Sequence, residues 1–176
     1  MGFFKKIVIA DWLAAFVNTV YDSPRDHTAV QLLIATYFFS IQIFCDFSGY
    51  TDIARGSAKV KGFELMQNFN RPYLARTIDD FWKRWHISLS TWFRDCLYIP
   101  LGGNRVSKPR WMFNLFVTFL ISGLWHGANW TYIVWGALHG TYFILSALTE
   151  SLRARLASLL GLGGWPRLRA ALSTLT

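Results

Sequence analysis

The stretch that decides the fold runs from Trp111 to Thr149 and reads WMFNLFVTFLISGLWHGANWTYIVWGALHGTYFILSALT. Its 39 residues include no Asp, Glu, Lys or Arg, although 16% of the 176-residue chain is charged. A membrane-spanning helix needs about 20 predominantly apolar residues. The stretch therefore predicts two short spans, 111–127 and 130–149, joined by a turn.

Two further apolar segments lie upstream. The 19 residues between Asp26 and Asp46 carry no charge and fit one span, 28–46. The segment 7–21 is shorter and carries Asp11, and it is the fourth candidate. With 53% hydrophobic and 18% aromatic residues, the chain is predicted to be an all-α, multi-span integral membrane helical bundle.

The basic residues predict the orientation of these spans, because Lys and Arg stay preferentially on the cytoplasmic side. Segment 47–110 holds eleven Lys or Arg against five acids, so it is expected to be cytoplasmic. Lys5 and Lys6 are placed on the same side, as is 150–176, a basic tail or the start of the next part of a longer protein. Because the basic residues border predicted spans, the net charge of +8 indicates a lipid bilayer as partner and argues against nucleic acid.

Within the cytoplasmic segment, Ile78–Tyr98 is predicted to form one amphipathic helix at the membrane interface. Thr77 before two acids is typical of a capped helix start. Aromatic side chains share one face, and six charges make crossing the bilayer unfavourable. Two i,i+4 ion pairs are expected on the other face, Asp79 with Lys83 and Asp80 with Arg84.

Three of the four histidines are candidate functional or structural groups: His86, His126 and His139. His126 interrupts the longest charge-free stretch, where an ionisable side chain is a candidate functional group. A neutral histidine that joins two spans by hydrogen bonds explains it equally well. His86 lies at the edge of the aromatic face, and a structural role is favoured there. His139 lies between Gly136 and Gly140, which also favours a structural role.

Most familiar active-site motifs are absent from the sequence. It contains no His or Cys spacing typical of a metal site, no nucleophile elbow and no glycine-rich phosphate loop of the usual kinds. The loop 101–105 is followed by basic residues that could meet a donor phosphate, although a plain tight turn is favoured there. The candidate phosphate contacts are Arg105, Lys108 and Arg110.

Three blocks carry a resemblance to a known family: FWKRWHISLSTWFRDCLYIPLGGNR (81–105), GLWHGANW (123–130) and CDFSGYTDIA (45–54). Together they resemble the membrane-bound O-acyltransferase family, in the branch that serves alginate O-acetylation. Because members of that family are considerably longer, the chain is expected to be a central to C-terminal fragment. Residues 1–149 would then form part of the membrane domain.

The resemblance implies a bacterial inner-membrane, multi-pass enzyme. It would move an acyl group, expected to be acetyl, from a cytoplasmic thioester (acetyl-CoA or an acyl carrier) to a hydroxyl of a polysaccharide. A periplasmic acetyltransferase or the polysaccharide acceptor is the expected partner, and no bound cofactor or metal is implied. The family's two histidines correspond to His86 and His126, with His126 the catalytic base. Asn129 and Ser122 are candidates to tune His126.

Two hypotheses of other classes stay open from the sequence. In a transporter or channel, the intramembrane histidines and the carboxylates Asp46 and Asp52 would relay protons or line a pore. In a non-catalytic scaffold, the chain would recruit a periplasmic acetyltransferase. Release of free thiol from a thioester separates an enzyme from both.

Overall fold

The computed structural model describes residues 1–159, and every regular element within them is helical. The predicted all-α class is confirmed for this part of the chain. The chain divides into two compact units, Met1–Asn68 and Phe69–Thr176, the second described as far as Leu159. Most of the predicted basic tail, residues 160–176, lies outside the described residues.

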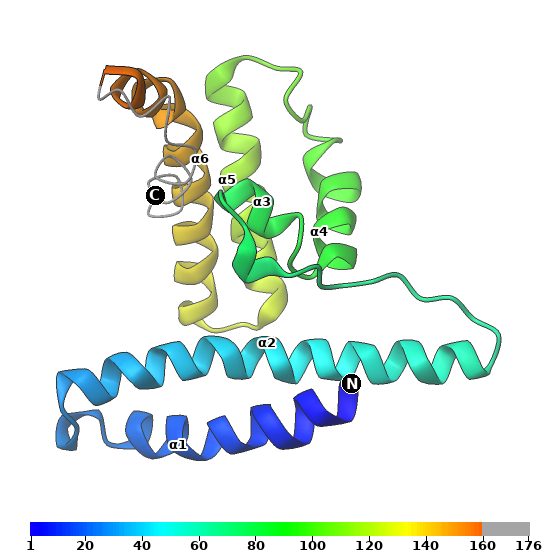
Figure 1. Ribbon diagram of the computed structural model, residues 1–176. Helices are drawn as coiled ribbons and strands as arrows, with labels where there is room; N and C mark the ends of the chain where they lie inside the picture. Colours follow the sequence, from blue (N-terminus) through cyan, green and yellow to red (C-terminus); the bar gives the residue numbers. More distant parts are fainter. Residues whose placement is uncertain (160–176) are drawn as a thin grey trace. The chain divides into compact units, whose positions relative to one another are not determined.

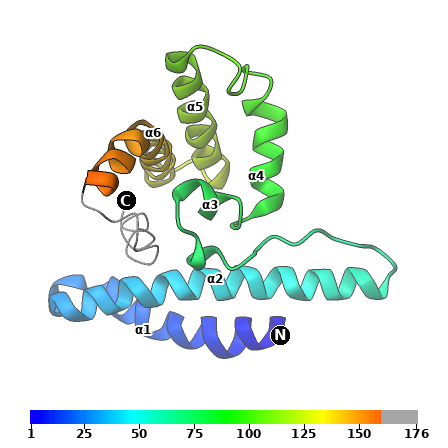
Figure 2. The ribbon, with the colours of Figure 1, turned by 45° about the horizontal axis from the view of Figure 1, so that its top comes forward.

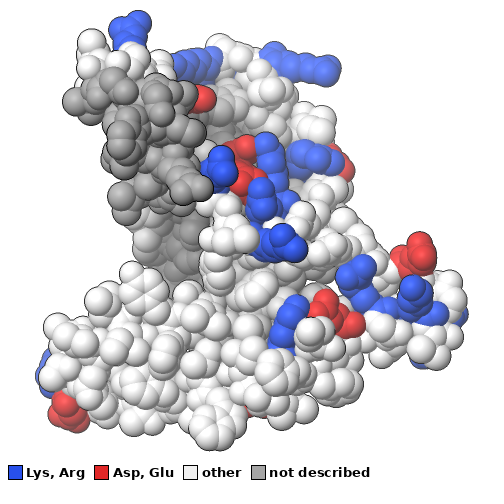
Figure 3. Space-filling model, viewed as in Figure 1, with Lys and Arg blue, Asp and Glu red and all other residues white. Residues whose placement is uncertain are grey.

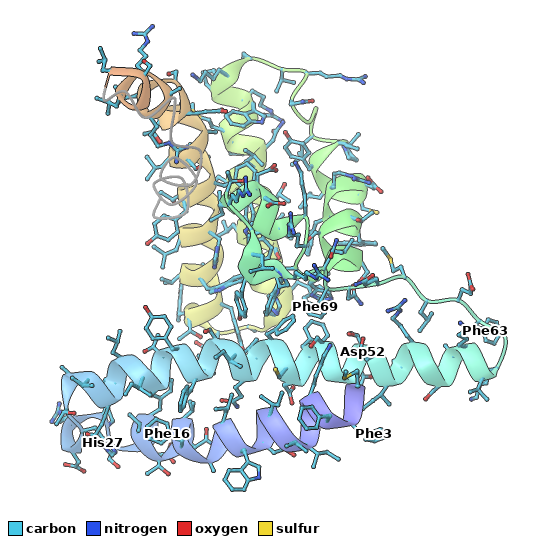
Figure 4. The ribbon with its side chains drawn as sticks, in the orientation of Figure 1. Phe3, Phe16, His27, Asp52, Phe63 and Phe69 are labelled. Atoms are coloured by element: carbon cyan, nitrogen blue, oxygen red, sulfur yellow. The ribbon has the colours of Figure 1, made fainter. Side chains whose placement is uncertain are left out.

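The first unit is a helical hairpin. A π-helical segment, Phe4–Ala10, runs without a break into α1 (Asp11–Asp22), a 3₁₀ turn follows at Pro24–Asp26, and α2 is Ala29–Val60. Both views show α1 and α2 side by side and antiparallel (Figure 1, Figure 2). Edge-to-face contacts join the two helices, with ring centroids 5.4 Å apart for Phe16 and Phe38 (Figure 4).

Helix α2 begins with a capping box. The backbone N–H of Gln31 donates to the Thr28 hydroxyl at 3.3 Å, and the Gln31 side chain accepts from the Thr28 N–H at 2.8 Å. These bonds satisfy two of the N–H groups that a helix start leaves without an intrahelical partner. The helix continues to Val60, well past residue 46 where the predicted span ends.

Among the described residues, α2 alone is both long and apolar enough to qualify as a membrane crossing. The other predicted spans, 7–21, 111–127 and 130–149, are helical in the structure, and their crossing of a membrane stays a prediction. Most of the face of the α1–α2 hairpin seen in Figure 3 is formed by uncharged side chains.

The second unit contains two long helices and a more irregular segment before them. The long helices, α5 and α6, form an antiparallel hairpin that both views show side by side (Figure 1, Figure 2). The elements in chain order are a 3₁₀ turn at Pro72–Leu74, α3 (Ile78–Trp82), α4 (Ile87–Phe93), a π-helical turn at Arg94–Tyr98, α5 (Lys108–His126) and α6 (Trp130–Leu159).

The single interface helix predicted for Ile78–Tyr98 is wrong, because the chain breaks between Trp82 and Ile87. His86 has φ +44° and ψ +55°, a left-handed conformation that cannot continue an α-helix. Tertiary contacts hold this break in place. The N–H of Asn70 donates to the carbonyl of Arg84 at 2.9 Å, and the Trp85 ring packs edge-to-face on Phe69 with centroids 5.0 Å apart (Figure 4).

The predicted local features of α3 are confirmed. The Thr77 hydroxyl accepts from the Asp80 N–H at 3.1 Å, which caps the helix. Both expected i,i+4 ion pairs form, Asp79 with Lys83 and Asp80 with Arg84, and Figure 3 shows acidic and basic side chains together over α3. The Arg84 guanidinium, which donates to Asp80 at 2.6 Å, lowers the pKa of that carboxyl.

Candidate functional site

Close packing of α5 against α6 creates the frame of the site. A Cβ built on Gly136 would lie 2.5 Å from the carbonyl oxygen of Phe119, and one built on Gly123 would lie 2.3 Å from that of Tyr132. Neither position therefore has room for a larger residue, and the two backbones approach each other closely. Small residues commonly allow such contacts between membrane helices.

This packing brings three of the histidines into one aromatic row. Successive ring centroids are 6.2 Å apart for His86 and Trp125, 5.1 Å for Trp125 and His126, 5.2 Å for His126 and Trp135, and 4.5 Å for Trp135 and His139. Trp82 is the last member of the row, and its ring centroid lies 5.2 Å from that of His139. We call these six side chains the aromatic row: His86, Trp125, His126, Trp135, His139 and Trp82.

His86 stands at the N-terminal end of α4, directly after the break. Its side chain is half-buried, and its carbonyl accepts from the Ser90 N–H at 3.0 Å, which begins the helix. Burial lowers the pKa of His86 to about 4, and a positive charge on the nearby His126 lowers it further in the same direction. His86 is therefore a neutral imidazole at pH 7. A neutral imidazole can donate a hydrogen bond, but it brings no positive charge to the site.

His126 is the last residue of α5, where the chain turns into α6. Its side chain is exposed within the described residues, and its ring stacks on Tyr132 with centroids 6.0 Å apart. Ser122 lies one helical turn earlier, on the same face of α5. The Asn129 side chain accepts from the Thr131 N–H at 3.1 Å and so holds the start of α6. The structure thus gives Asn129 a structural bond and places it in the turn after His126.

The candidate phosphate contacts lie on the loop before α5 and on the first turn of that helix. Arg105, Lys108 and Arg110 are all exposed, and the Arg110 guanidinium lies 5.2 Å from the Phe113 ring centroid. Three of the loop amides already have partners, since the N–H groups of Gly102, Gly103 and Arg105 donate to carbonyls of this turn at 2.9 to 3.1 Å. Any phosphate contact here therefore depends on the basic side chains.

Asp46 and Asp52 belong to the first unit and form ion pairs there. The Lys5 ammonium donates to Asp52 at 2.9 Å, and Lys6 donates to Asp46 (Figure 4). Each carboxylate thus has a lysine partner across the α1–α2 hairpin. Within residues 1–159, no group of three or more His, Cys, Asp and Glu is arranged to hold a metal ion.

Sequence reasoning missed two members of the aromatic row. His139, interpreted as structural, belongs to the aromatic row, and Trp82, interpreted as part of an apolar face, makes ring contacts with both helices of the hairpin. The i,i+4 spacing of Trp135 and His139 was the available signal. Asn114 was also missed. It is fully buried, and its amide donates to the carbonyls of Leu101 and Gly103 at 3.0 and 3.2 Å, which fixes the loop against α5.

With the two histidine blocks in one unit, comparison with known proteins decides the family. The model of the MBOAT, membrane-bound O-acyltransferase, family matches residues 1–159. The chain belongs to this family. The family assignment made from the sequence is thereby confirmed, and the chain is part of a membrane protein of an acyltransferase family.

The relatives of this MBOAT-family chain are named for different acceptors. A probable alginate O-acetylase of Azotobacter vinelandii is 44% identical over 96% of this chain and 36% of its own length. A peptidoglycan O-acetyltransferase of Helicobacter pylori is 48% identical over 80% of this chain and 27% of its own. A teichoic acid D-alanyltransferase of Bacillus subtilis is 32% identical over 79% of this chain and 37% of its own length. The chain thus spans roughly a third of these relatives, as expected for a fragment.

Membership of the acyltransferase family weighs against the other two hypotheses. A transporter or channel using Asp46 and Asp52 gains no support from carboxylates that are already paired with lysines. The match to an acyltransferase family favours an enzyme over a scaffold without chemistry.

Proposed function

We propose that the full-length protein is a multi-span O-acyltransferase of the bacterial inner membrane that acetylates hydroxyl groups of an exopolysaccharide such as alginate. The observation that carries this proposal is the placement of His86 and His126 on either side of Trp125. Two imidazoles at one end of α5, one of them exposed, can act on the same reacting group. Family membership and the named relatives support transfer to an oxygen.

The proposed chemistry begins with an acyl thioester, acetyl-CoA or an acyl carrier, delivered from the cytoplasm. His126 removes the proton from the acceptor hydroxyl, and the hydroxyl oxygen attacks the thioester carbonyl. When the carbon–sulfur bond breaks, His126 returns the proton to the leaving thiolate. The products are an ester and a free thiol, and His126 is neutral again.

His86 is proposed to stabilise the oxyanion that develops on the carbonyl. Because burial lowers the pKa of His86 to about 4, it can donate a hydrogen bond without being charged. Ser122, on the preceding turn of α5, is proposed to orient His126. Arg105, Lys108 and Arg110 are proposed to meet the phosphates of the donor.

The proposed topology places segment 47–110 and both ends of the membrane domain in the cytoplasm. The hairpin of the first unit supports this topology, since Lys5 and Lys6 pair with Asp52 and Asp46 in the second half of α2 and hence lie toward the same side of a membrane as the C-terminal end of that helix. The 32 residues of α2 extend about 48 Å, against roughly 30 Å for the hydrocarbon core. About twelve residues of α2 would therefore project into the cytoplasm.

The test uses the full-length protein in nanodiscs, with acetyl-CoA as donor and an alginate oligosaccharide as acceptor, and measures the free thiol released. His126→Ala is expected to lower turnover at least about 100-fold, the usual contribution of a positioned base. His86→Ala is expected to lower kcat with a smaller effect. His27→Ala is the matched control, because His27 lies in the turn between α1 and α2 and outside the aromatic row. Turnover by His126→Ala within a few-fold of wild type would refute the role of His126.

A further inference from the structure

Two polar ring atoms in the second unit are buried without a hydrogen-bond partner among the described residues. They are Nε1 of Trp82 and Nδ1 of His139. The two rings touch edge-to-face, with centroids 5.2 Å apart and planes at 86°. Buried polar atoms in proteins nearly always have hydrogen-bond partners. Because these two unpaired atoms belong to rings in contact, one shared partner would account for both.

The chemistry of the two atoms is complementary to one oxygen. The indole N–H of Trp82 can only donate, whereas Nδ1 of His139 accepts or donates according to its tautomer. A water or alcohol oxygen serves both cases, because it accepts from Trp82 and either donates to His139 or accepts from it. A carbonyl or carboxylate oxygen would serve only the tautomer that donates. The pair therefore favours a hydroxyl group over other oxygen ligands.

The packing around the two rings favours a specific binding site over a local packing defect. Trp82 reaches the α5–α6 hairpin from α3, with Phe119 at 5.4 Å and Trp135 at 5.8 Å between ring centroids. Backbone contacts of Gly136 and Gly140 with α5 hold His139 between them. Trp82 therefore cannot turn its indole nitrogen outward without disturbing its packing against this hairpin.

We propose that Trp82 and His139 together bind one hydroxyl oxygen, supplied either by a bound water molecule or by the acceptor substrate. Trp135 contacts both His139 and His126, so the ring of Trp135 separates the proposed oxygen site from His126, the proposed base. His139 and Trp82 are binding residues in this proposal, and the proton transfer stays with His126. That the acceptor substrate supplies this oxygen rests on the proposed function. That Trp82 and His139 bind an oxygen does not.

The experiment uses full-length protein in nanodiscs and compares wild type with Trp82→Phe, His139→Phe and the double variant. Both substitutions keep an aromatic ring and remove the nitrogen. We expect each single variant to lower Tm by about 2 °C or more, and the double variant to lose little beyond the larger single loss, because either change removes the shared oxygen. His139→Asn, which keeps a polar atom near the position of Nδ1, should recover part of the loss.

Trp135→Phe is the matched control for Tm, since it removes an indole from the same row without touching either orphan nitrogen. Trp82→Phe should lower Tm by more than this control does. The source of the oxygen is read from acyl transfer with acetyl-CoA and an alginate oligosaccharide. A KM for the oligosaccharide raised about tenfold at unchanged kcat identifies the acceptor hydroxyl, whereas an unchanged KM with the same Tm pattern identifies water.

Three results would overturn the proposal. The first is a Tm of Trp82→Phe and His139→Phe at or above that of wild type, because an apolar ring relieves a buried polar atom that has no partner. The second is strict additivity of the two Tm losses. The third is a full-length structure in which a protein group from outside residues 1–159 bonds either nitrogen. A full-length protein without acyl transfer would refute the proposed function and leave the Tm tests valid.

Discussion

Replacement of Gly136 by Ala tests whether close contact between α5 and α6 holds the site together. The added Cβ would lie 2.5 Å from the carbonyl oxygen of Phe119, with Cα of Leu120 and the carbonyl carbon of Phe119 at 3.2 Å. All three atoms belong to the backbone of α5, so no side-chain rotation can relieve the contact. The two helices must instead separate by roughly half an ångström or more.

The expected cost is the difference between two opposing terms. Overpacking of a tight contact typically costs about 1–3 kcal/mol. Glycine replaced by alanine within a helix gains about 0.5–1 kcal/mol, because the unfolded chain loses freedom. The cost of overpacking exceeds the gain from replacing glycine, and we expect Gly136→Ala to lower the free energy of unfolding by about 1–2 kcal/mol.

The glycines of the chain supply a graded series for this test. Gly140 is milder, since its nearest contacts are at 3.3 Å, whereas a Cβ on Gly56 in α2 would meet nothing within 4 Å. The expected order of Tm is Gly56→Ala at or above wild type, then Gly140→Ala, then Gly136→Ala. Thermal unfolding of the full-length variants in nanodiscs measures this order.

Turnover should follow the same order, because Trp135, the neighbour of Gly136, contacts His126 at 5.2 Å between ring centroids. A shift of this size near a reacting group lowers turnover by about tenfold or more. The reasoning is refuted if Gly136→Ala matches Gly56→Ala in Tm, or if Gly140→Ala proves the more harmful of the two hairpin variants.

Two further predictions concern His86 and Asn114. Because burial lowers the pKa of His86 from 6.5 to about 4, its stabilising contribution is complete above about pH 6.5 and is lost as the pH falls toward 4. Tm measured from pH 7 to pH 4.5 should therefore fall more steeply for wild type than for His86→Asn, whose asparagine tolerates the left-handed backbone; equal slopes would contradict the shift. Asn114→Leu removes two hydrogen bonds from a buried amide to loop carbonyls and should lower the free energy of unfolding by about 1–3 kcal/mol in denaturant titration. A loss no larger than that of an exposed control, Asn104→Leu, would show that the loop does not depend on Asn114.

Local sequence signals predicted the elements of this chain whose stability is local. Charge-free runs located the long helices, and Thr77 with its following acids located the start of α3. Both ion pairs of α3 followed from i,i+4 spacing. These features depend on neighbours in the sequence, and such neighbours can be read without knowledge of the fold.

The aromatic row could be predicted only in part, because it depends on contacts between distant segments. His86 and His126 were found through a resemblance to known sequences, whereas periodicity favoured a structural role for His86. The ring contacts of Trp82 with Phe119 and His139 join residues 37 and 57 positions apart. No local pattern contains that information, since it is set by how α3 packs against the α5–α6 hairpin.

The break at His86 explains why the segment predicted as one helix contributes two separate ring contacts to the site. Trp82 packs beside Phe119, while His86 packs beside Trp125, and these two partners lie about 9 Å apart along α5 at 1.5 Å per residue. An unbroken helix would separate positions 82 and 86 by only about 6 Å along its axis. With the break, Trp82 and His86 reach these two partners together. A left-handed residue costs about 1–2 kcal/mol, and the ring contacts on both sides of the break offset that cost.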